Sequence, residues 1–152
     1  MIILKSKHEK IVQDLVNEIA DYQKLLYYRA IAEQITMGEG VIVRQHSEYI
    51  SDPINCRYVL RCVMFDFNNG TSEKLEVCEF PTQYEANELK DKILSDDNLQ
   101  RVLSELRCIS QVAYHSPINY EDLNKKIFRY SVLFRRWTKR ITKFVNETKV
   151  QR

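Results

Sequence analysis

Glycine and proline are scarce in this sequence, with three of each among 152 residues. Both are abundant in chains that cannot form a packed core, so their scarcity argues against a disordered or low-complexity protein. Few glycines also leave little loop backbone to hold phosphate, and the glycine-rich motifs of nucleotide-binding folds and hydrolases do not occur. We therefore do not expect nucleotide-dependent catalysis.

Cysteine and histidine are also sparse, and their spacing excludes the common metal-binding motifs. The four cysteines include no C-x-x-C pair, and no two of the three histidines lie four residues apart. We predict reduced thiols, no metal, no cofactor and no catalytic residue. The alternative is an enzyme whose active site assembles only in the folded chain.

Long hydrophobic runs are missing as well. No window approaches the ~18 uninterrupted apolar residues of a membrane-spanning helix, and the apolar start of the chain is too short for a signal peptide. We predict a cytoplasmic protein that does not bind membranes. Hydrophobic residues nevertheless make up 44% of the chain, enough for one packed core, and the length is typical of one domain. We predict a single domain over residues 1–152.

The first amphipathic pattern covers residues 7–35 and predicts a long helix that stops at Gly38 and Gly40. Its apolar residues share one arc of the helix: Ile11, Val12, Leu15, Val16, Ile19, Tyr22, Leu26 and Ala30. The helix would be about 43 Å long, while a domain of this size has a radius of gyration of about 15 Å. It must bend or project. Because a projecting helix has to cover its apolar arc, we hypothesise a homodimer through this helix.

Three strand-like segments follow the first helix. β-branched and aromatic residues are frequent in residues 41–50, 57–67 and 74–80. Ser51-Asp52-Pro53 ends the first segment, since proline lacks the amide that a strand ladder needs. The pattern predicts a three-stranded antiparallel meander.

A hairpin turn is predicted at Asn68-Asn69-Gly70-Thr71, because glycine and asparagine accept the positive φ of tight turns. A loop of three or five residues would align Val63 with Val77 or Leu75. A loop of two residues would shift every pairing by one, so the register stays open.

Three more helices complete the chain, over residues 83–94, 95–109 and 120–148. Thr82 and Glu85 form a capping box before the first of them, and Ser95-Asp96-Asp97 predicts the start of the second. Ser116-Pro117 and Asn119 precede the last. The order α-β-β-β-α-α-α predicts an α+β fold with a long N-terminal amphipathic helix.

The charge of the chain is divided unevenly. Residues 1–119 carry 13 Lys or Arg and 18 Asp or Glu, whereas residues 120–152 carry 10 and 3. The predicted helix 120–148 is therefore strongly basic, and no acidic residue occurs between Asp122 and Glu147. Helix faces exposed to water usually mix charges of both signs, so this face lacks compensation within its own helix.

The last helix has two distinct faces on a helical wheel. Its apolar stripe covers about 120° and contains Ile127, Tyr130, Leu133, Phe134, Trp137, Ile141, Phe144 and Val145. The opposite face forms our candidate binding site for a partner or a nucleic acid: Lys125, Arg129, Arg135, Arg136, Lys139, Arg140 and Lys143, with Phe128 and Val132 among them. Apolar groups set among cations are typical of a contact surface for an acidic partner.

We interpret the protein as a non-enzymatic interaction or regulatory protein, in the style of viral or phage accessory factors, that binds an acidic macromolecule through the basic helix. The ligand is either an acidic protein surface or, as the alternative, the phosphate backbone of DNA or RNA. A third possibility is a face that only improves solubility and balances the acidic remainder of the chain.

Overall fold

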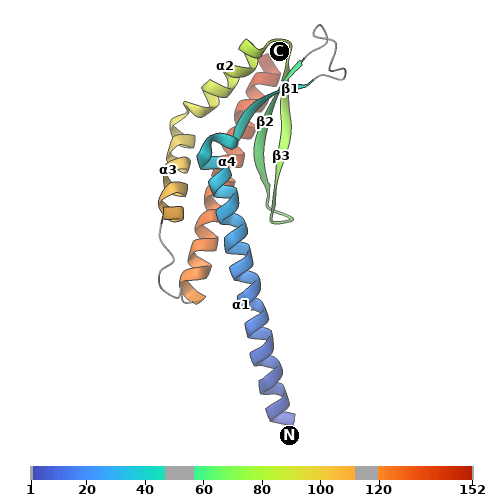
Figure 1. Cartoon of the computed structure of the whole chain (residues 1–152), viewed down its shortest axis with the longest axis vertical. Helices are drawn as coiled ribbons and strands as arrows, with labels where there is room; N and C mark the ends of the chain where they lie inside the picture. Colours follow the sequence, from blue (N-terminus) through green and yellow to red (C-terminus); the bar gives the residue numbers. More distant parts are fainter. Residues whose placement is uncertain (1, 47–56, 112–119, 152) are drawn as a thin grey trace.

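The structure, a computed structural model, describes residues 2–46, 57–111 and 120–151. These ranges hold four α-helices and three strands in the order α-β-β-β-α-α-α, which confirms the predicted α+β class. In Figure 1 the sheet, three helices and the end of the first helix form a body, from which the rest of the first helix projects. No helix in these ranges has both the length and the apolar character required to cross a membrane.

Helix α1 (Ile2–Gln34) is 33 residues long, or about 50 Å, so it projects rather than bends. It continues into the π-helical turn η1 (Ile35–Glu39), in which Gly38 has a φ of +89°. Because only glycine adopts this conformation without strain, Gly38 ends the helix as predicted.

The body covers a different face of α1 from the predicted apolar arc. The buried side chains are Leu25, Tyr28, Ile31, Ala32 and Ile35. The members of the arc from Ile11 to Ile19, together with Leu26, are exposed instead. The two faces lie about 160° apart at 100° per residue. The prediction of a long N-terminal helix is confirmed, but most of its predicted apolar arc is not part of the core.

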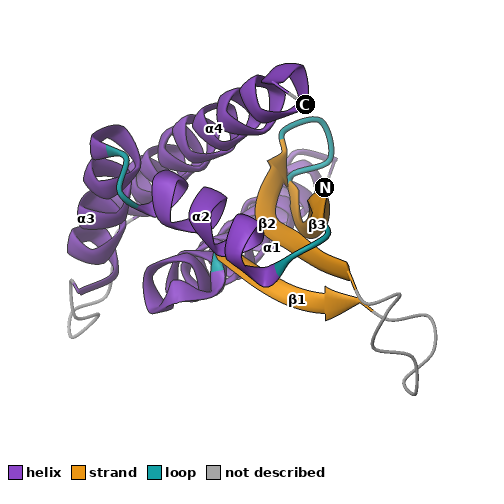
Figure 2. Cartoon of the chain, turned by 90° about the horizontal axis from the view of Figure 1, so that it is seen from above, coloured by secondary structure: helices purple, strands orange, loops and turns teal. Residues whose placement is uncertain are grey.

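The sheet is an antiparallel meander of β1 (Val41–His46), β2 (Arg57–Asp66) and β3 (Thr71–Phe80), as predicted. The predicted continuation of the first strand and its break at Pro53 fall outside the described residues. Figure 2 shows the sheet on one side of the body and helix α3 on the other, with α2 between them.

The β2–β3 hairpin resolves the open register. Its turn covers four residues, so Val63 pairs with Lys74 rather than with Val77 or Leu75. From Arg61 to Asp66, odd-numbered residues of β2 pair with even-numbered residues of β3 and the reverse, as a two-residue loop would also require. An irregularity between Leu60 and Arg61 shifts the pairing by one residue. Gly70 takes the positive φ of +67° that the turn needs.

Helices α2 (Gln83–Leu94), α3 (Asp97–Gln111) and α4 (Tyr120–Gln151) lie close to their predicted ranges. The Thr82 hydroxyl accepts a hydrogen bond from the Glu85 amide at 3.3 Å, and the Asp96 carboxylate accepts one from the Leu99 amide at 3.1 Å. Both predicted helix starts are thus capped. The predicted start signals of α4 at Ser116-Pro117 and Asn119 lie outside the described residues.

Helix α4 packs its whole predicted apolar stripe into the core. All eight side chains of the stripe are at most 9% exposed. Tyr28 of α1 and Phe65 of β2 meet Phe134 at ring centroid distances of 5.5 and 5.3 Å, so the stripe joins the first helix to the sheet. This packing fixes which face of α4 points outward.

Helix α4 also takes the place of a strand beside β2. Strand β1 pairs with β2 only as far as Cys62. Beyond that point the Trp137 indole donates to the Val63 carbonyl at 2.9 Å, and the Thr138 hydroxyl accepts from the Phe65 amide at 3.0 Å. A side chain at Gly40 would bring a Cβ to 2.9 Å from the Trp137 ring, so glycine is required there for space rather than for backbone freedom.

Candidate functional site

A groove between α3 and α4 collects much of the basic face. Its volume is about 600 Å³. Helix α3 contributes Asn98, Arg101, Val102 and Glu105, and α4 contributes Arg136, Lys139, Arg140 and Lys143. Each wall repeats at the i, i+3 or i+4, i+7 spacing of one helix face, so the fold of each helix alone aligns its four side chains. Five cations and one carboxylate therefore line the groove.

Arg140 is fixed at the N-terminal end of α3. Its guanidinium donates two hydrogen bonds to the Asp96 carboxylate, at 2.8 and 3.0 Å. The same guanidinium lies 5.1 Å from the centre of the Phe144 ring. The hydrogen bonds from Arg140 lower the pKa of Asp96 below its usual value, and the amides of Leu99 and Asn98 add to this effect. Arg140 is thus a structural part of the groove wall.

Arg136 is held more loosely. Its guanidinium lies 3.8 Å from the Glu105 carboxylate across the groove, and both side chains are about half exposed or more. A long ion pair between exposed groups contributes little to stability. An incoming carboxylate or phosphate can therefore replace Glu105 at small cost.

The remaining three cations of the groove are open to a ligand. Within the described residues, no hydrogen bond or ion pair is formed by the side chains of Arg101, Lys139 or Lys143. All three residues are exposed. The groove consequently offers a positive potential that its own fold does not cancel.

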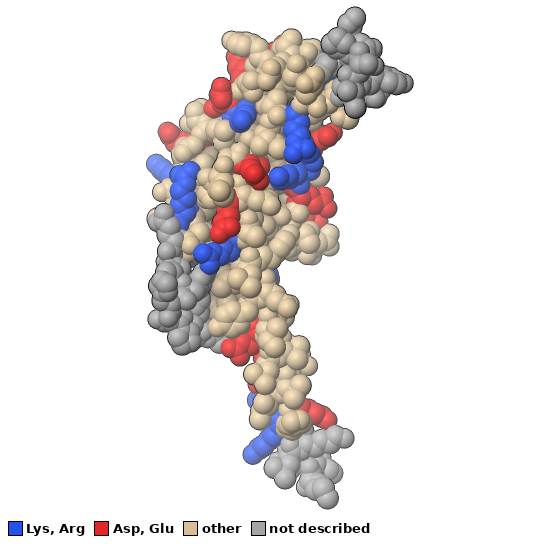
Figure 3. All heavy atoms as spheres, in the orientation of Figure 1, with Lys and Arg blue, Asp and Glu red and all other residues tan. Residues whose placement is uncertain are grey.

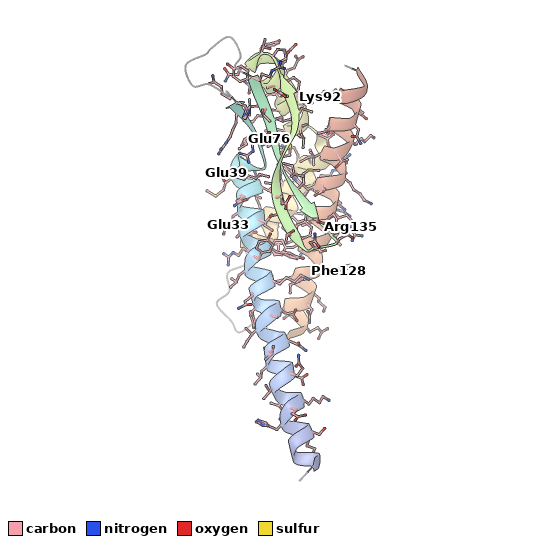
Figure 4. The ribbon with its side chains drawn as sticks, turned by 90° about the vertical axis from the view of Figure 1, so that its right-hand side faces the viewer. Glu33, Glu39, Glu76, Lys92, Phe128 and Arg135 are labelled. Carbon is pink, nitrogen blue, oxygen red and sulfur yellow. The ribbon has the colours of Figure 1, made fainter. Side chains whose placement is uncertain are left out.

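The structure separates the nine predicted binding residues. Arg136, Lys139, Arg140 and Lys143 line the groove. Arg135 instead turns to the β2–β3 hairpin, where its guanidinium lies 4.9 Å from the centre of the Phe67 ring. Figure 4 shows Arg135 on the hairpin side of α4, with Phe128 just below it.

The other predicted residues lie on the first half of α4. Lys125 pairs with Glu121 at 3.3 Å, Arg129 is exposed, and Val132 is half-buried. Phe128 is 69% exposed. None of these four lines the groove in the part of the chain that the structure describes.

The expectation that this face lacks compensation within its own helix is wrong for Lys125 but not for Arg136 and Arg140, although all three residues have carboxylate partners. Their partners come from Glu121 at the start of α4 and from two residues near or in α3. A search for charge pairs between Asp122 and Glu147 misses Glu121, which lies just before that segment. It also misses Asp96 and Glu105, which tertiary packing brings in from α3 and its cap. The uncompensated part of the face is therefore smaller than the sequence indicates.

Arg101 is the groove residue that the sequence reading missed. It lies on α3, whose few charged residues are of mixed sign and form no basic run. The available signal was the spacing of Asn98, Arg101 and Glu105, which places a cation between two polar residues on one face.

Two observations concern the reactivity of Cys62 and the potential for metal binding at the described positions. Burial raises the pKa of the Cys62 thiol to about 12, with Cys78 adding to the shift, so Cys62 stays protonated and unreactive at neutral pH. Among the described residues, no group of three or more His, Cys, Asp or Glu side chains could hold a metal ion.

Comparison of the chain with models of protein families, with curated proteins and with solved structures finds no match.

Proposed function

We propose that the protein is a non-enzymatic interaction protein whose α3–α4 groove binds an acidic segment of another protein. The observation that supports this function is the convergence of Arg101, Lys139 and Lys143, none of which is paired within the described residues, around one groove. Arginine and lysine side chains in such a concave site favour carboxylates and exclude basic partners. We place this activity in the cytoplasm.

The extent of the groove favours a peptide over a nucleic acid. Arg136 and Lys143 span seven residues of α4, or about 10 Å. Specific protein–DNA interfaces bury ~1,000–2,500 Å² of protein and follow a longer track of phosphates. Arg135 and Lys125, which could extend such a track, are engaged with Phe67 and Glu121. Figure 3 also shows Lys and Arg interspersed with Asp and Glu over the visible face of the body.

The apolar part of the lining adds a second preference. Val102 and the methylene stems of the basic side chains form part of the groove wall. A segment that alternates carboxylates with small apolar residues would satisfy both features, whereas a purely ionic ligand would leave the apolar surface in contact with water.

The test compares two double charge reversals on the same helix. Lys139→Glu with Lys143→Glu alters the groove, and Lys125→Glu with Arg129→Glu makes the same change of net charge outside it. The probe is a short peptide that alternates glutamate with alanine, with single-stranded and double-stranded oligonucleotides in parallel at low and moderate salt. Binding is followed by NMR through the backbone amides of residues 98–105 and 136–143.

We expect the groove variant to bind the peptide at least about 10-fold more weakly and the control variant to bind within about 2-fold of the unmodified chain. Equal loss in both variants would mean attraction by net charge alone and would overturn the proposal. Stronger, salt-dependent binding of oligonucleotides would replace it with the nucleic-acid alternative. Absence of binding to any probe would also contradict it.

A further inference from the structure

The projecting part of α1 carries a continuous exposed apolar stripe. Ile11, Leu15 and Ile19 are 58%, 53% and 58% exposed, and Leu26 is 62% exposed. Val12 and Val16 complete the stripe at similar exposure. Side chains of this kind normally lie in cores or interfaces, and so many on one helix face indicate a contact surface.

The stripe contains no charge. Between Ile11 and Leu26 it occupies an arc of about 140°, in which Gln23 is the one polar residue. The charged residues of this segment lie on the remaining part of the helix: Lys7, Glu9, Lys10, Asp14, Glu18, Asp21 and Lys24. In Figure 3 the projecting helix is accordingly mostly tan, with few charged atoms on the visible side.

The spacing of the stripe is that of a coiled coil. Val12, Leu15, Ile19, Tyr22 and Leu26 alternate steps of three and four residues, which assigns Val12, Ile19 and Leu26 to a positions and Leu15 and Tyr22 to d positions. The β-branched residues Val12 and Ile19 at a, with Leu15 at d, favour parallel two-stranded pairing.

The flanking positions also suit a second copy. In a parallel pair, the g position of one helix lies next to the e position of the other. Ile11 at g would therefore contact Val16 at e of the second copy, and both residues are apolar. The seven charges on the outer side nearly cancel, with three lysines and four carboxylates, so two copies do not repel one another strongly. A foreign partner of distinct charge would find nothing on this stripe to recognise.

The body leaves the stripe accessible. At the level where α1 enters the body, Leu25 is 3% exposed while Leu26 is 62% exposed. The core therefore lies on the far side of the helix from Leu26, and only Tyr22 of the stripe packs partly against it. Two parallel α1 helices, with axes about 8–10 Å apart, would carry the two bodies on their outer sides. The stripe ends at the body because Arg29 and Glu33 follow on the same face, where they form an ion pair.

We propose that α1 pairs in parallel with α1 of a second copy of this chain through Val12, Leu15, Ile19 and Leu26. The pair is reversible: six half-exposed aliphatic side chains offer on the order of 300 Å² of apolar surface per copy, against about 800 Å² in a standard stable interface. The dissociation constant should fall in the micromolar range. Formation of the dimer does not depend on the acidic ligand. If the groove binds as proposed, the dimer carries two such grooves, one on each copy.

Sedimentation velocity of the full chain over a range of concentrations tests the pairing. We expect a monomer at about 1 μM and a dimer at about 100 μM or above. Ile19→Lys places a charge in the seam of both copies and should weaken the dimer at least about 100-fold, while Asn17→Lys on the opposite side should leave it within about 2-fold. Circular dichroism of each variant at low concentration checks that α1 and the body remain folded.

Cysteine cross-linking tests the parallel register. Leu15→Cys is off-centre in the stripe, so its thiols meet in a parallel pair but lie well beyond the ~7 Å limit for a disulfide in an antiparallel one. Asp14→Cys on the polar face is the matched control, and both are made with Cys108→Ser because Cys108 is exposed.

Mild oxidation should join Leu15→Cys chains and leave Asp14→Cys chains unjoined. A monomer at 100 μM or more, a higher oligomer, equal weakening by Ile19→Lys and Asn17→Lys, or equal cross-linking of both cysteine variants would each overturn the proposal.

Discussion

Helices α1 and α4 are nearly equal in length, at 33 and 32 residues, and both carry an apolar stripe along one side. The body buries the stripe of α4 completely. It leaves most of the stripe of α1 in water and instead buries a different face, from Leu25 to Ile35. The comparison teaches that a helical pattern predicts which side of a helix avoids water, but not which molecule covers it.

The difference follows from where the two helices lie, because their lengths are nearly equal. Most of helix α4 lies beside the sheet and beside α3. Helix α1, in contrast, contacts the body only from about Tyr22 onward (Figure 1). Helix α4, of nearly the same length, is covered because neighbouring elements lie alongside it, whereas most of α1 has no element of the body beside it. The projecting part is therefore available for association, and the contacting part supplies core.

The sharpest test of this contrast is truncation of one apolar residue from each stripe. Trp137→Ala removes a 1%-exposed indole and its hydrogen bond to Val63, so we expect a loss of about 3–5 kcal/mol in the free energy of unfolding. Ile19→Ala should change the stability of the monomeric chain by less than about 0.5 kcal/mol. Urea denaturation at low protein concentration measures both. Similar losses in the two variants would refute the distinction between the helices.

A smaller effect is expected where α4 meets the end of η1. Gly40→Ala forces a methyl group against the Trp137 ring and should cost about 1–3 kcal/mol of unfolding free energy. The backbone of Gly40 has a φ of −70°, which alanine adopts readily, so the cost is steric.

The control is the same substitution in a Trp137→Phe background, where the smaller ring leaves space. We expect the cost of Gly40→Ala to fall by at least half there, measured as a double-mutant cycle. An unchanged cost would locate its cause in the backbone.

The smallest effect concerns the charge pair that joins α4 to α3. Arg140 lowers the pKa of Asp96 in the folded state, so the ionised carboxylate stabilises the fold at pH above the usual Asp value of about 3.9. This stabilisation is lost as the pH falls through the lowered pKa. Asp96→Asn keeps the helix cap but removes the charge.

The stability difference between the unmodified chain and Asp96→Asn should therefore be constant from about pH 5 upward and shrink towards pH 2. Thermal unfolding across this pH range measures it. In an Arg140→Gln background the pH-dependent part should largely vanish, and a difference that persists unchanged at low pH would contradict the assignment.

Local sequence signals predicted most of the fold. Thr82 with Glu85, Asp96 and Gly38 mark helix ends through their own hydrogen bonds or backbone conformation, and all three do so in the structure. The sequence left the hairpin register open. In the structure Asp66 organises a four-residue turn, accepting hydrogen bonds from Asn68 and Asn69 at 2.9 and 2.8 Å. That turn depends on side-chain geometry, which residue spacing does not specify.

The candidate site was predictable only in part. The outward direction of Arg136, Lys139, Arg140 and Lys143 follows from the helical period of α4. Their convergence with Arg101 depends on how α3 packs against α4, which no pattern within one helix contains. The same packing supplies Asp96 and Glu105 as partners, and so reduces the charge that the sequence appeared to leave open.

The replacement of a strand by α4 beside β2 has a consequence during protein synthesis. Trp137 follows Val63 by 74 residues, a stretch that takes roughly 4–15 s to translate at about 5–20 residues per second. Until α4 emerges, the Val63 carbonyl and the Phe65 amide form an open strand edge, which is a template for pairing with another nascent chain. Ribosomes that translate one message in close succession would bring such edges together, so the timing of α4 sets the interval in which chaperone protection matters most.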